Sequence, residues 1–298
     1  MSLKPSLDKN WVISEDDVSR GKMRFQETLF ALGNGYIGAR GTLEEGYREG
    51  YAGTFIAGIY DRDKGQSAEI VNAPNPFHVE IYVNGKKLSM DDMKVVEHRR
   101  ILDMKNAVLS RRTVFTDAGK RYEYESMRFI SLRNMHSGVL RFSFRASDSD
   151  ADVVIRRIID GTTSNEIQAV GEPVKHYSVI HASDMGNGEL YLEARTNDLG
   201  ILIGVASADD METRKFQSVA ETKCYTDGES VVREFRFNAR KGKRYRFNEY
   251  ISIYTSHNFE HDVKSACLNE VESAREQGIP RLLRKHVGAW DRRWQNCD

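Results

Sequence analysis

The sequence has little cysteine and little proline, and it has no excess charge of either sign. Its 298 residues include 3 cysteines and 5 prolines. Cys224, Cys267 and Cys297 are too few and too scattered for a disulfide framework or a cysteine-rich metal site, so we expect a reducing, cytoplasmic location. Lysine plus arginine and aspartate plus glutamate number 44 each. The basic excess that is typical of nucleic-acid binders is therefore missing.

Long hydrophobic runs are also missing. No stretch approaches the roughly 18 apolar residues of a membrane span. The first residues, MSLKPSLDKNWV, lack the apolar core of a secretion signal. We therefore expect neither a nucleic acid nor a membrane as a partner. Apolar residues still make up 40% of the chain, which is enough for a large core.

Glycine is concentrated in one segment, residues 33–58, which we call the glycine-rich segment. It holds 8 of the 23 glycines, and it begins within the motif ETLFALGNGYIGARGTLEEGY at residues 27–47. The motif contains G-x-G-x-x-G, but a dinucleotide site needs a strand before it and a helix after it. Four more glycines follow by residue 53, and each would cost a helix about 1 kcal/mol. Two interpretations stay open: a turn that allows close packing, or a loop that faces a ligand.

Most of the chain has the pattern of short β-strands. Residues 79–83 alternate apolar and polar side chains, and Asn84-Gly85 follows at once as a hairpin signal. We expect further strands at residues 51–60, 107–115, 121–130, 140–145, 153–159, 189–194, 201–206, 231–237 and 245–254. Many short strands without helices between them predict a sandwich or a barrel rather than βαβ units.

The pattern becomes helical near residue 257. Val263, Cys267 and Val271 recur with helical spacing, and Gly278 stands where a helix would end. After Pro280, one face of a second helix carries Leu283, Val287, Trp290 and Trp294. The sequence stops within this second helix, so we expect the chain to be part of a longer protein.

No group of residues has the spacing of a catalytic or metal site. His257 and His261 are four residues apart, but the glutamate of an H-E-x-x-H zinc motif is absent, so we expect no metal. The aromatic residues of the glycine-rich segment and its surroundings allow either core packing or a sugar-stacking surface. They are Tyr36, Tyr51, Phe55, Tyr60 and Phe77.

Several charged pairs are expected at the surface. Adjacent residues of a strand point to opposite faces, so Glu44-Glu45 and Asp209-Asp210 predict solvated turns rather than catalytic dyads. The basic pairs Arg99-Arg100 and Arg111-Arg112 alternate with apolar residues and predict outer strand faces.

Several segments together carry a resemblance to a known family. Besides the motif at residues 27–47, they are AGIYD, IVNAPNPF, RRILDMKNAVLSRR, GKRYEYESMRFISLRNMH and the terminal HVGAWDRRWQNCD. The chain resembles the N-terminal domain of glycoside hydrolase family 65, which holds maltose, trehalose and kojibiose phosphorylases and related hydrolases. The resemblance covers the first 136 residues or so and the C-terminal end, while residues 145–250 match in strand pattern alone.

The resemblance implies a fold and a role. The fold is mainly β, a large antiparallel super-β-sandwich like those of galactose mutarotase and the glucoamylase N-domain, followed by a short helical linker. Residues 1–256 would form the sandwich. Residues 257–298 would lead to an (α/α)6-barrel that lies outside this sequence and carries the general acid and the phosphate-binding residues. We therefore expect no catalytic residue, metal or cofactor in this chain. Inorganic phosphate would be the co-substrate of the parent enzyme, if that enzyme is a phosphorylase.

The resemblance also implies partners: the chain's own barrel, an α-glucoside disaccharide and a second copy in a homodimer. We expect the loops at residues 34–40 and 74–77 to form a wall of the substrate pocket, with Asn34, Tyr36, Arg40, Asn75 and Phe77 as its residues. Two alternatives stay open. One is a stand-alone carbohydrate-binding module, and the other is a mutarotase-like epimerase, since aldose epimerases share a similar large sandwich.

Overall fold

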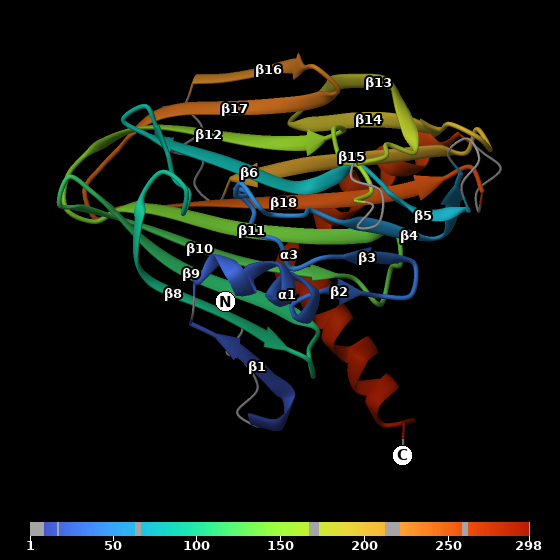
Figure 1. Ribbon diagram of the computed structural model, residues 1–298, viewed down its shortest axis with the longest axis horizontal. Helices are drawn as coiled ribbons and strands as arrows, with labels where there is room; N and C mark the ends of the chain where they lie inside the picture. The colour runs from blue at the N-terminus through green and yellow to red at the C-terminus, as the bar shows by residue number, and fades with distance from the viewer. Residues whose placement is uncertain are drawn as a thin grey trace.

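The largest element of the computed structural model is a nine-stranded antiparallel sheet (Figure 1). The structure describes residues 9–16, 18–62, 67–166, 173–211, 221–257 and 262–297. In spatial order the sheet consists of β1 (Val12–Glu15), β8 (Lys94–Asp103), β9 (Val108–Asp117), β10 (Lys120–Ile130), β11 (Ser137–Ala146), β18 (Arg244–Thr255), β15 (Leu202–Met211), β14 (Glu189–Thr196) and β13 (Tyr177–Gly186).

Two smaller antiparallel sheets accompany it. The five-stranded sheet consists of β16 (Glu221–Asp227), β17 (Ser230–Ala239), β12 (Ala151–Asp160), β6 (Asn75–Val83) and β7 (Lys86–Lys87). The four-stranded sheet consists of β2 (Leu32–Gly33), β3 (Ile37–Ala39), β4 (Thr54–Asp61) and β5 (Glu69–Asn72). One hydrophobic core joins all three sheets. Across it, the ring of Phe235 in the five-stranded sheet lies 5.5 Å from that of Phe247 in the nine-stranded sheet.

Local sequence signals explain how the strands form. In β10, Tyr122 and Tyr124 are buried in the core, whereas the alternate residues Glu123 and Glu125 are partly exposed, as a strand with one buried face requires. At the β6–β7 hairpin, Asn84 and Gly85 both have positive φ, 50° and 82°. These are the signs that a type I′ turn needs, and Asn-Gly adopts them readily.

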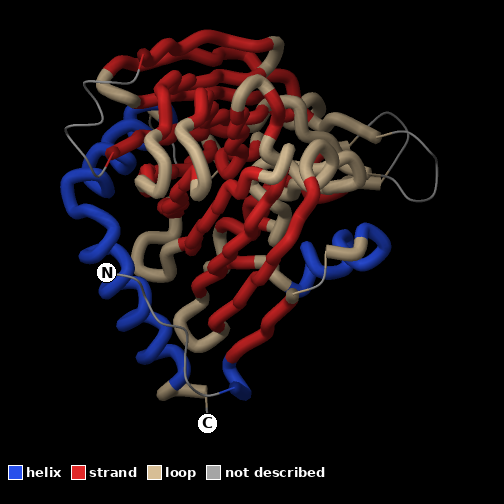
Figure 2. Tube along the Cα trace, turned by 90° about the vertical axis from the view of Figure 1, so that its left-hand side faces the viewer, coloured by secondary structure: helices blue, strands red, loops and turns tan. Residues whose placement is uncertain are grey.

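Helices lie on both sides of the nine-stranded sheet (Figure 2). The long helix α3 (Val263–Trp294) covers one face, where its residues join two small apolar clusters with β11, β14, β15 and β18. Gly278 interrupts α3 with φ of 71° and ψ of 154°, so the predicted pair of helices is present as one element with a break. The short helix α1 (Arg20–Leu29), on the opposite side, and the 3-10 helix η1 (Lys9–Trp11) were not predicted.

The mainly β sandwich followed by a helix is therefore confirmed. No helix in the described ranges is long and apolar enough to cross a membrane. The predicted division between a sandwich domain ending at residue 256 and a linker starting at residue 257 stays a prediction.

Candidate functional site

Asn34 organises the first turn of the glycine-rich segment. Its buried side-chain amide donates to the carbonyl oxygens of Ser131, at 2.8 Å, and Met135, at 2.9 Å. Its Oδ1 accepts the backbone N–H groups of Tyr36, at 2.9 Å, and Ile37, at 2.8 Å. Asn34 thus ties this turn to the turn between β10 and β11, because it makes two hydrogen bonds to each of them. Its side chain has no hydrogen-bonding capacity left for a ligand.

Tyr36 belongs to an aromatic group at the same end of the sandwich. Its ring lies 4.4 Å from the ring of His136, which stacks on Tyr254 at 3.8 Å. The Tyr36 hydroxyl lies 3.5 Å from Oγ1 of Thr255. Burial raises the pKa of Tyr36 and lowers the pKa of His136, so both side chains are held in their neutral forms.

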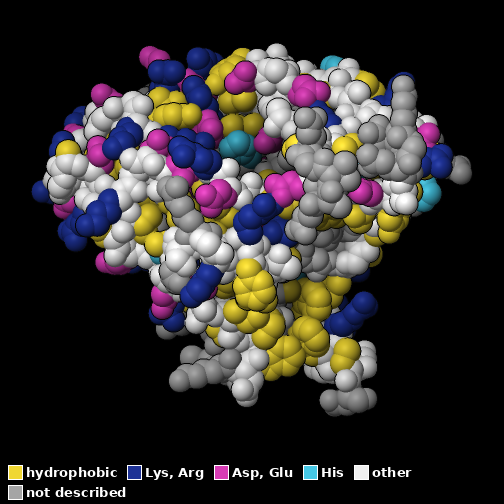
Figure 3. Space-filling model, in the orientation of Figure 1, with side chains coloured by type: hydrophobic (Ala, Val, Ile, Leu, Met, Phe, Trp, Pro, Cys, Tyr) yellow, Lys and Arg dark blue, Asp and Glu magenta, His cyan; other side chains and the backbone are white. Residues whose placement is uncertain are grey.

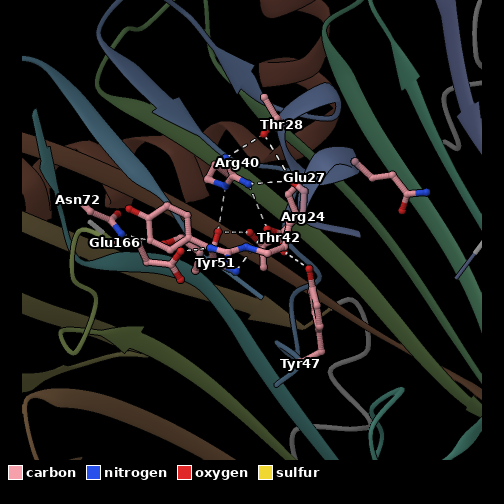
Figure 4. A network of polar contacts seen from close by, with 12 residues as sticks. Arg24, Glu27, Thr28, Arg40, Thr42, Tyr47, Tyr51, Asn72 and Glu166 are labelled. Atoms are coloured by element: carbon pink, nitrogen blue, oxygen red, sulfur yellow. Dashed lines mark hydrogen bonds and ion pairs between the residues drawn. The ribbon is translucent and has the colours of Figure 1, made fainter. Parts of the chain in front are cut away.

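Arg40 connects helix α1 to the β3–β4 loop (residues 40–53). Its Nε donates to the Tyr51 carbonyl oxygen at 3.1 Å, and its Nη1 donates to Thr28 Oγ1 at 3.0 Å (Figure 4). Its Nη2 donates to the Arg24 carbonyl oxygen at 3.0 Å and lies 3.3 Å from Glu27 Oε2. Every guanidinium nitrogen therefore has a partner, and the side chain clamps the loop to the helix.

Glu27 is the buried centre of this clamp. Its Oε1 accepts the Tyr47 hydroxyl at 2.8 Å, and its Oε2 accepts the Tyr51 N–H at 3.3 Å as well as the Arg40 contact (Figure 4). Burial and the hydrogen bond to Glu27 raise the pKa of Tyr47. A charged residue of α1 thus fixes both ends of the β3–β4 loop.

Arg40, Asn75 and Phe77 come together at one small pocket. Its lining consists of Ala39, Arg40, Thr42, Leu43, Ala52, Gly53, Asn75, Phe77 and Arg128. The pocket is small, with room for roughly one water molecule. The structure thus brings three of the five predicted wall residues together, whereas Asn34 and Tyr36 lie at the turn described above.

Phe77 is also a core residue. Its side chain is 4% exposed and belongs to the main hydrophobic core. The Arg128 guanidinium lies 5.7 Å from the centre of its ring. Oδ1 of Asn75 accepts the Phe77 N–H at 3.0 Å and so fixes the first residues of β6. Of the two interpretations of the aromatic residues, core packing is the one that Phe77 shows.

Two buried arginines hold three consecutive carbonyl groups of the β3–β4 loop. Nη2 of Arg128 donates to the carbonyl oxygens of Arg40, at 3.2 Å, and Thr42, at 2.9 Å. Nη1 of Arg100 donates to the Gly41 carbonyl oxygen at 2.9 Å. Burial lowers the pKa of Arg128, and burial together with neighbouring arginines lowers the pKa of Arg100 to about 10. The backbone beside the pocket is therefore rigidly placed.

The surface positions predicted for four charged residues in and beneath this loop are wrong, namely Glu44, Glu45, Arg100 and Arg111. Glu44 and Glu45 are buried, and both bind Arg111: Nη1 of Arg111 lies 3.1 Å from Glu44 and 2.6 Å from Glu45. Arg100 and Arg111 lie on the inward face of the sheet, where the β3–β4 loop covers them, while Arg99 and Arg112 are exposed as predicted. The covering loop comes from far away in the sequence, so the local pattern does not reveal it.

Asp209 is a further correction. It is buried, and Nη1 of Arg157 donates to its Oδ1 at 2.6 Å. Nη2 of Arg157 also donates to Glu249 at 2.8 Å, and burial raises the pKa of Glu249. A signal was present in the sequence, because Arg157 occupies an inward position of the strand at 153–159 by the period of two. The same rule places Arg111 and Arg128 inward.

Potential metal ligands are scattered in the part of the chain that the structure describes. No group of three or more histidine, cysteine, aspartate or glutamate side chains there could hold a metal ion. His257 is described, whereas His261, four residues later, lies outside the described residues.

A family model and related sequences place the chain in a known family. Residues 13–293 match the model of the glycosyl hydrolase family 65 N-terminal domain, and the chain belongs to this family. Kojibiose phosphorylase from Thermoanaerobacter brockii is 33% identical over 297 residues, which are 98% of this chain and 38% of that protein. Maltose phosphorylase from Bacillus subtilis (strain 168) is 25% identical over 304 residues, which are 97% of this chain and 39% of that protein.

A solved structure shows the same fold. A putative kojibiose phosphorylase from the human microbiome matches with a TM-score of 0.83 and 17% sequence identity, covering 96% of this chain and 38% of that one. The resemblance inferred from the sequence motifs is thus confirmed. The chain spans about two fifths of the length of these relatives.

Proposed function

We propose that this chain is the non-catalytic β-sandwich domain of a longer family 65 enzyme that acts on α-glucosidic disaccharides. The match over residues 13–293 supports this proposal. So do the relatives, which are named kojibiose, nigerose and maltose phosphorylases and of which the chain spans 38% to 39%. The longer protein would be cytoplasmic and homodimeric, with inorganic phosphate as its co-substrate.

The reaction proposed for the longer protein is inverting. A general acid protonates the glycosidic oxygen while phosphate, or water in a hydrolase, attacks the anomeric carbon from the opposite side. Both roles would belong to an (α/α)6-barrel outside this sequence. The residues of the sandwich would instead bind and orient, because positioning of the substrate lowers the barrier as long as the surrounding groups are fixed.

The observation that carries this role is the convergence at the pocket. Arg40 comes from the β3–β4 loop, and Asn75 and Phe77 come from the start of β6, yet they line one pocket. The backbone there is held by Arg100 and Arg128. Such a preorganised surface supports the proposal that the loops at 34–40 and 74–77 form one wall of the substrate pocket.

Helix α1 supports packing against the proposed barrel. Phe25 and Leu29, one turn apart, are 66% and 42% exposed. Hydrophobic side chains gather on the part of the surface where α1 and the end of α3 lie (Figure 3). Neighbouring exposed apolar side chains mark interaction surfaces more often than isolated ones do.

The test uses the longer protein. Asn75→Ala and Arg40→Gln are compared with Arg62→Gln, a control at an exposed arginine that is paired with Asp198. We expect the first two variants to lower kcat/KM for the disaccharide about tenfold or more, while Arg62→Gln leaves it unchanged. Thermal unfolding of the isolated chain measures the cost in stability separately. Unchanged kinetics in both pocket variants would refute the proposal that these loops form a wall of the substrate pocket.

The isolated chain provides the second arm. We expect it to release neither glucose nor glucose 1-phosphate from kojibiose, maltose, trehalose or nigerose. Calorimetric titration with the same sugars separates the proposal from a stand-alone carbohydrate-binding module, which would bind them without the rest of the enzyme.

A further inference from the structure

The charged side chains in and beneath the β3–β4 loop do not balance. Four guanidinium groups and three carboxylates meet there, which leaves one positive charge in excess. They are Arg40, Arg100, Arg111 and Arg128, and Glu27, Glu44 and Glu45. Six of the seven side chains are buried, and Arg40 is partly exposed. Burying an unbalanced charge is costly unless a counter-charge accompanies it.

Arg128 is the arginine beside the pocket that has no direct carboxylate contact, and Glu44, which Arg111 contacts, stabilises its charge only from a longer distance. Arg111 contacts two carboxylates, and Arg40 contacts Glu27. Arg128 is only 4% exposed and donates only to two carbonyl oxygens; no carboxylate of the described residues lies within 4.0 Å of it. A guanidinium group has five N–H donors, so Arg128 has donors left for another ligand.

Each of the other polar side chains of the pocket either has a free hydrogen-bond donor or is already hydrogen-bonded within the protein. Oδ1 of Asn75 accepts the Phe77 N–H, so its NH2 group remains, and that group has no acceptor among the described residues. The Thr42 hydroxyl donates to the Tyr51 carbonyl oxygen. The nitrogens of Arg40 are all engaged, and its aliphatic part approaches Gly53. No carboxylate lines the pocket.

We propose that this pocket binds one small anion of halide size between the Arg128 guanidinium and the Asn75 amide. The pocket has room for roughly one water molecule, which is comparable in size to a single halide ion. The anion neutralises the excess charge and fixes the backbone of the β3–β4 loop. This inference rests on the pocket and does not depend on the proposed role in a longer enzyme.

The direct test is a crystal of this chain soaked in sodium bromide. We expect an anomalous difference peak within hydrogen-bonding distance of both Arg128 and Asn75. If bromide appears at other surface positions while the pocket holds water, the soak has detected an adventitious ion only. That result would overturn the proposal.

Asn75→Asp supplies the missing negative charge from the protein itself and keeps the acceptor for the Phe77 N–H. The matched control is Asn296→Asp, which makes the same chemical change at an exposed residue. In wild type and control, replacing sodium gluconate by sodium chloride at equal ionic strength should raise Tm by about 2 °C at about ten times the dissociation constant. Asn75→Asp should show no such rise and no bromide peak. An equal chloride response in all three proteins would refute the site.

A second variant guards against an effect of Asn75→Asp on folding. Arg128→Gln removes the positive charge, and it should abolish excess broadening of the chloride NMR line in any folded sample. Broadening that persists in both Arg128→Gln and Asn75→Asp would place the bound chloride elsewhere.

Discussion

We predict that His286 makes the docking of helix α3 sensitive to acid. The side chain is 0% exposed and lies between α3 and the nine-stranded sheet. Its Nδ1 accepts the Leu132 N–H at 3.1 Å, and its Nε2 lies 2.9 Å from the Asn106 carbonyl oxygen. The neutral tautomer with the proton on Nε2 satisfies both contacts. A second proton on Nδ1 would face the Leu132 N–H, so protonation must break this contact.

The size of the loss in stability follows from the difference between the pKa of His286 in the folded and the unfolded states. Burial lowers the pKa of His286 to about 4, whereas an unfolded chain has a histidine pKa of about 6.5. The folded state thus binds this proton less readily, so its contribution to stability is complete above the unfolded pKa and is lost as the pH falls towards 4. Between about pH 7 and about pH 5, the free energy of unfolding should fall by about 2 kcal/mol because of this residue.

The assay is urea unfolding followed by tryptophan fluorescence, because the rings of Trp290 and His286 lie 6.4 Å apart. His286→Gln cannot take up the proton, so it should be less stable near pH 7 but lose about 2 kcal/mol less than wild type on going to about pH 5. His98, whose pKa is lowered to about 3 by burial and two arginines, contributes equally to both proteins.

The control for this experiment is His181→Gln at an exposed histidine, which should keep the acid sensitivity of wild type. Parallel losses of stability in wild type and His286→Gln would show that the acid sensitivity comes from other groups, and the reasoning from burial would be wrong.

Three further predictions concern packing. Gly204→Ala would place a Cβ 2.5 Å from Cγ1 of Val263 and 3.1 Å from Sγ of Cys267, so we expect a loss of about 1–3 kcal/mol in urea unfolding; Gly21→Ala, with open space around it, should cost nothing. Phe77→Ala should lower the free energy of unfolding by about 3–5 kcal/mol because it empties a core position, and an unchanged Tm would contradict this. Phe25→Ser with Leu29→Ser should change the stability of the isolated chain by no more than about 0.5 kcal/mol per residue but lower Tm in the longer protein, whereas Leu199→Ser should lower neither.

The strands could be predicted because their signals are local. The alternation at Tyr122 and Tyr124 and the turn at Asn84-Gly85 depend on neighbours within a few residues, and strand and turn geometry act over that range. The same holds for the break in α3 at Gly278, where positive φ favours glycine. The resemblance added what local patterns could not, namely the choice of a sandwich over a barrel.

The buried charges could not be predicted in the same way. Whether Arg111 faces water depends on a loop that starts about seventy positions earlier in the chain, and Glu44 and Glu45 in that loop become its partners. The period of two places Arg111 inward but gives no information about what covers it. An arginine at an inward position of an apolar strand is a sequence signal for a buried charge. Arg128 and Arg157 are examples.

The glycine-rich segment combines a structural task with the candidate site. A Cβ on Gly41 would lie 2.5 Å from the Cβ of Phe30 and 2.8 Å from its carbonyl oxygen, so only glycine lets the β3–β4 loop approach the end of α1. That approach forms the 2.7 Å hydrogen bond from the Gly41 N–H to the Glu27 carbonyl oxygen. The close-packing interpretation therefore holds at Gly41. The same approach brings the loop carbonyls within reach of Arg100 and Arg128, and the pocket at Arg128 exists because of it.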